Sequence, residues 1–255
     1  MPLITEDAAQ HGFAYRFGWG AEGLEALAPV CDVIVIVDVL RFTTAVSVTV
    51  AGGSTVFPYR WRDETASEYA HQRSAVLGGR REDGPVSLSP TDLMSLPTGS
   101  RIVLPSPNGS TLSFRAGELG AAFVLAGSLR NATATAHRAS TLADTAPIGV
   151  IASGERWPGS EAGLRPSVED MLGAGAVLVA LDPSGAVGAP GCSPEAAAAR
   201  SAFIDARPQL ADRLASCASG RELTRIAFGD DVATAAELDV SDVAAQLVGD
   251  AFIAA

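Results

Sequence analysis

The chain has 255 residues, 47% of them hydrophobic, which is enough for one large α/β domain or two compact lobes. Its net charge of −11 argues against nucleic-acid binding and against attachment to a membrane surface, because both need a basic surface. All 18 basic residues are arginine, so no Schiff base and no phosphate-binding lysine of the Walker type can form.

The three cysteines and three histidines are scattered, without the spacing of a zinc site. This pattern is typical of reduced, buried cytosolic thiols. The N-terminus lacks the basic-then-apolar pattern of a signal peptide, and no apolar run reaches the ~18 residues that span a bilayer. We therefore expect a cytoplasmic protein with no nucleic-acid or membrane partner.

The strand expected over residues 33–38 is the most informative element. Five consecutive β-branched residues indicate a strand buried on both faces, and hence a mainly parallel sheet. In such sheets ligands bind outside the carboxyl ends of the strands, where Asp38 and Arg41 would lie. A carboxylate suits a divalent cation and a guanidinium suits phosphate or carboxylate. Alternatively, Asp38 could only cap the next helix and Arg41 could pair with Glu169.

The rest of the chain repeats a strand, a polar loop and a helix. After a polar, glycine-containing stretch over 1–31, strands are expected at 33–38, 55–57, 76–77, 101–104, 123–126 and 148–152. Helices are expected at 43–51, capped by Thr43 or Thr44, at 64–75, and at segments ending near 119, 143 and 181. Residues 82–100 are expected to form a long loop. This rhythm predicts a three-layer α/β/α fold around a mainly parallel sheet.

The last part of the chain is alanine-rich and helical. We expect helices at about 194–206, 208–217, 219–227 and 240–253. The predicted organisation is an α/β core over 1–185 and an α-helical C-terminal segment over 186–255 that packs on the core. Little chemistry is expected from this segment.

Polar side chains follow almost every predicted strand and should converge on one edge of the sheet. They combine acids for a metal, arginines for oxyanions and donors near helix N-termini, a mixture that phosphoryl transfer needs. Each has an ordinary alternative: Pro-Asn-Gly-Ser is a common turn, and two acids after Ser167 would favour the helix dipole. The candidates are Asp38, Arg41, Arg80, Arg81, Ser106, Asn108, Ser110, Arg130, Asn131, Glu155, Arg156, Glu169 and Asp170.

Four ordered motifs carry a family resemblance. They read VDVLRFTTA (37–45), LPSPNGSTLS (104–113), AGSLRNATA (126–134) and SVEDMLGAGAVL (167–178). Together they resemble the ComB family of Mg-dependent 2-phosphosulfolactate phosphatases. The resemblance implies an α/β fold, a Mg²⁺ cofactor and hydrolysis of a phosphate ester on a 2-hydroxy acid. The corresponding positions are Asp38, Arg41, Asn108, Gly109, Asn131, Glu169 and Asp170.

The resemblance leads to a set of expected roles. Asp38, Glu169 and Asp170 would be metal-binding or acid/base carboxylates, and Arg41 would join them as a catalytic residue. Residues expected to bind substrate are Arg80, Arg81, Ser106, Asn108, Gly109, Ser110, Asn131 and Arg156. The DxDxT motif of haloacid dehalogenases does not fit, because Leu40 replaces its second acid.

The segment 78–90 departs from the ComB pattern. The family typically has a Gly-Glu-Arg-Gly-Gly stretch and a later Asn-Ser-Pro, whereas this chain has Gly79 and Leu88 at the Glu and Asn positions. This departure leaves three hypotheses open. The leading one is a Mg-dependent phosphatase, the second a protein that binds a small anion without hydrolysing it, and the third an interaction protein. The sequence leaves open whether the chain forms a homodimer.

Overall fold

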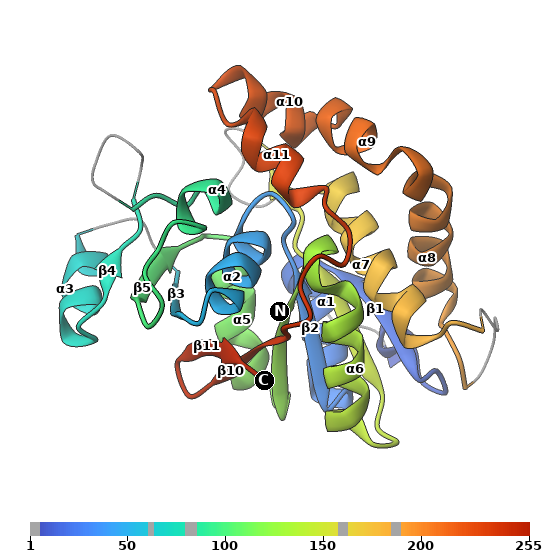
Figure 1. Ribbon diagram of the computed structural model, residues 1–255. Coiled ribbons are helices and arrows are strands. Elements are labelled where there is room, and N and C mark those ends of the chain that lie inside the picture. The colour runs from blue at the N-terminus through green and yellow to red at the C-terminus, as the bar shows by residue number, and fades with distance from the viewer. Residues whose placement is uncertain (1–5, 61–63, 80–85, 158–162, 185–189) are drawn as a thin grey trace.

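The computed structural model describes residues 6–60, 64–79, 86–157, 163–184 and 190–255. A nine-stranded sheet forms its centre (Figure 1). The strands lie in the order β1 (Tyr15–Trp19), β7 (Ile148–Ala152), β2 (Val33–Val37), β6 (Phe123–Gly127), β10 (Ala245–Val248), β11 (Ala251–Ala254), β3 (Thr55–Tyr59), β5 (Arg101–Pro105) and β4 (Val76–Leu77). Strands β1-β7-β2-β6 are mutually parallel, as are β3-β5-β4, and the antiparallel hairpin β10–β11 joins the two groups. The predicted α/β class with a mainly parallel sheet is confirmed.

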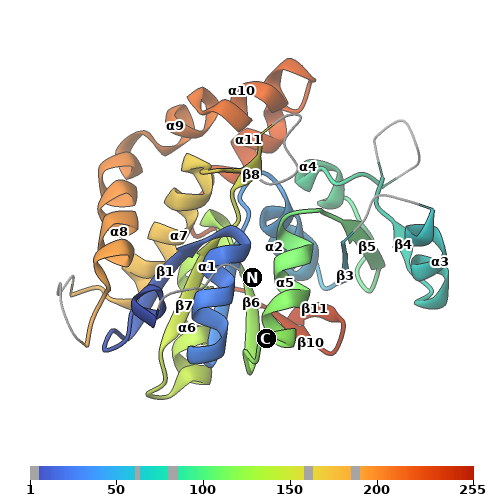
Figure 2. The ribbon, with the colours of Figure 1, turned by 180° about the vertical axis from the view of Figure 1, so that it is seen from behind.

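Strand β2 is buried on both faces, as its sequence predicts. All five of its residues are 0% exposed. Val33, Val35 and Val37 pack in one cluster with α6 (Ala132–Ala143), α7 (Val168–Leu181) and α8 (Pro194–Ala206). Ile34 and Ile36 pack in another with α1 (Gly20–Leu27) and α5 (Gly109–Glu118), which cover the opposite face in Figure 2. Strict alternation of side chains along a strand gives each layer its own core.

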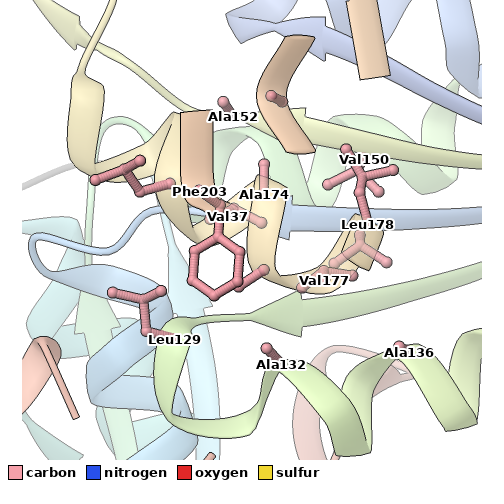
Figure 3. Packing of buried hydrophobic residues seen from close by; sticks show 14 of the residues in the cluster. Val37, Leu129, Ala132, Ala136, Val150, Ala152, Ala174, Val177, Leu178 and Phe203 are labelled. Atoms are coloured by element: carbon pink, nitrogen blue, oxygen red, sulfur yellow. The ribbon is translucent and has the colours of Figure 1, made fainter. Parts of the chain in front are cut away.

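The first of these cores depends on small residues in α7. Figure 3 shows Ala174, Val177 and Leu178 of this helix beside Val37 of the sheet and Phe203 of α8. A Cβ atom on Gly175 would overlap the Ala199 carbonyl of α8. Glycine there allows the two helices to approach closely.

The remaining helices cover the second half of the sheet and one of its ends. Helix α2 (Phe42–Ala51) packs on β10–β11 and α3 (Thr65–Gln72) on β5. Helices α9 (Leu210–Ser216), α10 (Ala218–Arg225) and α11 (Gly229–Ala235) arch over the loop that leaves β2 (Figure 1). Shorter elements are α4 (Pro90–Leu93), the pair β8 (Glu155–Arg156) and β9 (Leu164–Arg165), and 3₁₀ turns at Glu6–Ala9, Ala28–Val30, Leu129–Asn131 and Arg207–Gln209.

Three sequence predictions of elements are wrong, and one of them is the loop expected over 82–100, which contains the short helix α4. Residues 240–253 were expected to be helical but form the hairpin β10–β11, which turns at Gly249, where φ is +62°. A glycine in this left-handed region is typical of a two-residue hairpin turn, and such a turn interrupts a helix. Residues 1–31 contain β1 and α1 rather than an irregular stretch alone. No helix of the described residues is long and apolar enough to cross a membrane.

Candidate active site

Asp38 lies where β2 ends, at the meeting point of two helix N-termini. Its Oδ1 accepts the Phe42 amide, the first of α2, at 3.2 Å. Its Oδ2 accepts the Gly109 amide, the first of α5, at 3.1 Å. Helix N-termini carry positive partial charge, so both helices stabilise the ionised carboxylate. The residues after two different strands are therefore brought together, as the sequence predicts.

The turn between β2 and α2 is braced by its threonines. The Thr43 hydroxyl accepts the Asp38 amide at 2.9 Å and donates to the Asp38 carbonyl at 2.8 Å. The Thr44 hydroxyl donates to the Val39 carbonyl. The expectation that Thr43 or Thr44 caps α2 is wrong: both hydroxyls hold the preceding backbone, and Asp38 takes the helix amide. The turn is thereby fixed around the carboxylate.

Gly109 has to be glycine for this arrangement. A Cβ atom there would overlap the Phe42 ring and lie 2.9 Å from Asp38 Oδ2. The close approach of α5 to Asp38 therefore depends on the missing side chain. The glycine of the Pro-Asn-Gly-Ser stretch has a packing role beyond that of an ordinary turn residue.

Asp170, in the first turn of α7, ties two strand ends together. Its Oδ1 accepts the Val39 amide at 2.7 Å and its Oδ2 the Gly154 amide at 2.9 Å. The neighbouring Glu169 is 3% exposed and shares a hydrogen bond with the Cys217 thiol of the C-terminal segment. Burial, reinforced by the nearby Glu169, raises the pKa of Cys217 to about 12. Both predicted acids therefore lie close to Asp38, with partners of their own.

Burial and the charges of neighbouring acids raise the pKa values of Asp38 and Asp170. Burial raises the pKa of Asp38 to about 6, and the charges of Glu155 and Glu169 add to this effect against the two helix amides. Burial, followed by the charges of Asp38 and Glu169, raises the pKa of Asp170 well above its ordinary value. This concentration of buried carboxylates favours either a shared proton or a bound cation.

A cavity of about 310 Å³ opens in front of Asp38. One part of its wall is polar and comprises Asp38, Arg41, Ser106, Asn108 and Glu155. The other part comprises Leu40, Phe42, Leu88, Pro107 and Leu223. Its size and mixed lining suit a small molecule with a charged and an apolar part.

A second cavity of about 150 Å³ adjoins the first and shares Pro107, Asn108 and Glu155 with it. Asn108 Nδ2 donates to Glu155 Oε1 at 3.0 Å, so this bonded pair contributes to both cavities. The smaller cavity is also lined by Ser153, by the exposed Arg156 and by Gly20–Glu22 at the N-terminus of α1. Glu155 is absent from the predicted binding set, because beside Arg156 it resembles half of an ordinary solvated pair.

Arg41 is held by the C-terminal segment. Its Nη1 forms an ion pair of 2.6 Å with Asp231 of α11, and its guanidinium lies 4.3 Å from the centre of the Phe228 ring. The alternative expectation, that Arg41 pairs with Glu169, is therefore wrong. The segment from which little chemistry is expected thus supplies Leu223 to the cavity wall and Asp231 to the ion pair of Arg41.

Of the other candidate residues, the structure describes Ser110, Asn131 and Arg130, and each has a protein partner of its own. The Ser110 hydroxyl donates to the Leu104 carbonyl, and Asn131 Oδ1 accepts the amide and hydroxyl of Ser128. Arg130 pairs with Glu237. Arg80 and Arg81 lie outside the described residues.

The comparison with protein families identifies the chain. The model of 2-phosphosulpholactate phosphatase matches residues 23–250. The chain belongs to the 2-phosphosulpholactate phosphatase family. The resemblance to ComB is thereby confirmed, and the match includes α10, α11 and strand β10 as well as the four motifs. A comparison with curated proteins found no match.

The positions of the carboxylates show whether this member of the 2-phosphosulpholactate phosphatase family has ligands suited to a metal ion. Within the described ranges, no three His, Cys, Asp or Glu side chains are arranged to hold an ion. Mg²⁺, however, is commonly bound by one or two carboxylates together with water and substrate phosphate. Asp38 and Glu155 both line the larger cavity, so the donor set fits Mg²⁺ bound in this way.

Proposed function

We propose that this protein hydrolyses the phosphate ester of a small 2-hydroxy acid, resembling 2-phosphosulfolactate, with Mg²⁺ as cofactor. The observation that carries the proposal is the position of Asp38. It is a buried carboxylate at two helix N-termini, and it faces a 310 Å³ cavity in a chain of this phosphatase family. Phosphoryl transfer depends mainly on positioning and on neutralising charge, and this arrangement serves both.

Each residue of the larger cavity has a distinct role in the proposal. Asp38 and Glu155 hold Mg²⁺, which when bound neutralises phosphate oxygens and orients the attacking group. Arg41 pairs with phosphate oxygens, and Ser106 and Asn108 donate hydrogen bonds to them. Asp170 fixes the loops after β2 and β7 through the Val39 and Gly154 amides.

The second acidic group of the substrate is assigned to the smaller cavity. The first residues of α1 lie there with no side-chain cap on the helix, beside Arg156 and the buried Ser153 hydroxyl, which has no hydrogen-bond partner among the described residues. A carboxylate or sulfonate would satisfy these donors. The sequence predicts a catalytic and metal-binding role for Glu169 and substrate binding by Gly109, Ser110 and Asn131. In this proposal these residues support the site instead, since each is already engaged with protein atoms.

The proposal is tested by phosphate release from phospholactate, phosphosulfolactate and related esters, with and without Mg²⁺. Wild-type protein should turn over at least one ester only when Mg²⁺ is present. Asp38→Asn should be inactive, whereas Asp32→Asn, an exposed acid before the same strand, should retain activity. A fully active Asp38→Asn variant would remove Asp38 from the mechanism.

A second candidate function is binding of a small anion without hydrolysis. It is favoured by Leu88, which lines the cavity and stands where the family has asparagine. Calorimetry that detects binding of an ester, together with an assay that finds no phosphate release, would support this alternative. A cytoplasmic location accords with the three buried free cysteines.

A further inference from the structure

The C-terminal segment reaches the cavity through one buried acid. Asp231 is 1% exposed, and its Oδ2 lies 2.6 Å from Arg41 Nη1. Phe228, at the start of the same helix, stacks on the guanidinium at 4.3 Å. Arg41 is therefore held from two directions by residues of α11 and its N-cap, while it remains part of the cavity wall.

Asp231 also joins Arg41 to the segment before α4. Its Oδ1 accepts the Ser89 hydroxyl and, at 3.4 Å, the Thr91 amide. Both oxygens of one carboxylate thus connect the loop after β2, the N-terminus of α4 and helix α11. Leu88 lies next to Ser89 and lines the cavity, so this connection runs along the cavity's edge.

We propose that Asp231 is a positioning residue, which orients Arg41 for an oxyanion in the cavity. The proposal rests on the proposed function, because it takes phosphate as the ligand of that cavity. A guanidinium has five N–H donors in a rigid fork, so an ion pair through Nη1 leaves donors to meet phosphate oxygens. Fixing a long side chain before the ligand arrives removes the entropy cost of ordering it on binding.

The test compares Asp231→Asn with Asp230→Asn, an exposed neighbour on the same helix that carries the same charge. Asp231→Asn should weaken the Kd of inorganic phosphate, measured by calorimetry with Mg²⁺ present, by about tenfold, the usual effect of losing one charged hydrogen bond. The kcat/KM for the ester should fall by a similar factor, mainly through KM. Asp230→Asn should change neither value.

A double-mutant cycle separates positioning from general stability. In an Arg41→Ala background, Asp231→Asn should cause little further loss, because its effect passes through Arg41. Additive losses would overturn the proposal. Tighter phosphate binding by Asp231→Asn would also overturn it, since Asp231 would then be competing with phosphate for Arg41.

Two further results keep this proposal distinct from the proposed function. If wild-type protein hydrolyses no ester but binds phosphate, and Asp231→Asn weakens that binding, the phosphatase assignment fails and the positioning role stands. If Asp231→Asn does not fold, Ser89→Ala replaces it, because it releases one oxygen of Asp231 and keeps the ion pair. It should weaken phosphate binding about threefold, within the range of a neutral hydrogen bond, and an unchanged Kd would count against the proposal.

Discussion

The buried carboxylate of Asp38 should make the stability of this protein fall as pH rises. Burial raises its pKa from 3.8 to about 6. Between these two values the folded protein holds a proton that the unfolded chain has released, so folding is progressively disfavoured as pH rises through that window and fully so above it. Replacing Asp38 with asparagine removes this titration and should flatten this part of the pH dependence.

The size of the effect follows from the two pKa values. The difference between the unfolded and folded pKa values, from 3.8 to about 6, corresponds to about 3 kcal/mol. Solvent does not weaken this effect, because the carboxylate is buried. Asparagine can accept only one of the two helix amides, which costs about 1–3 kcal/mol at every pH. At pH 4 the unfolded chain has already released part of its proton, so the free energy of unfolding of Asp38→Asn, relative to wild type, should increase by about 2 kcal/mol between pH 4 and pH 7.5, whatever its absolute value.

Urea unfolding of both proteins across this range, without divalent cations, measures the difference. Asp32→Asn is the control and should run parallel to wild type. Adding Mg²⁺ at pH 7.5 should restore stability to wild type and not to Asp38→Asn, because a cation favours the ionised carboxylate. Parallel curves for wild type and Asp38→Asn would refute the reasoning, since they would mean that Asp38 ionises as readily in the folded protein as in the unfolded chain.

Three further substitutions test the surroundings of Asp38. Gly109→Ala should lower the free energy of unfolding by about 1–3 kcal/mol in urea and abolish phosphate release, because its Cβ would displace Phe42 or Asp38. Asn131→Ala should lower the thermal midpoint by removing a cap worth about 1 kcal/mol, while the activity per folded molecule is retained. Glu155→Gln removes one of the charges that raises the pKa of Asp38, so the acidic limb of kcat/KM should move to lower pH and Mg²⁺ affinity should fall.

The parts of the fold predicted from sequence are those fixed by local periodicity. Five β-branched residues in succession identify β2, and the polar turns that follow β2 and β5 place Asp38 and Gly109 at one edge. Their contact also depends on the order of the strands, because β2 and β5 belong to different parallel groups that the antiparallel hairpin β10–β11 joins. The sequence does not predict this order.

The missed contacts are those between distant segments. Asp231 lies 190 residues from Arg41, and nothing in the sequence around it differs from an ordinary acidic start of a helix. The helix predicted over 240–253 is wrong because the prediction rested on the local preference of alanine for helices. Pairing with β6 and β3 decides the structure of this segment instead. The sequence does not reveal the position of Glu155 in the cavity wall, because its hydrogen bond to Asn108 connects loops that follow different strands.

The charges around the cavity suggest why phosphate and Mg²⁺ would bind together. Asp38 and Glu155 bring negative charge to the wall that phosphate must approach, and the guanidinium of Arg41 is already paired with Asp231. Phosphate alone would therefore meet repulsion that the helix N-termini of α2 and α5 only partly offset. A cation between the carboxylates and the phosphate converts this repulsion into attraction on both sides, so each ligand strengthens the binding of the other.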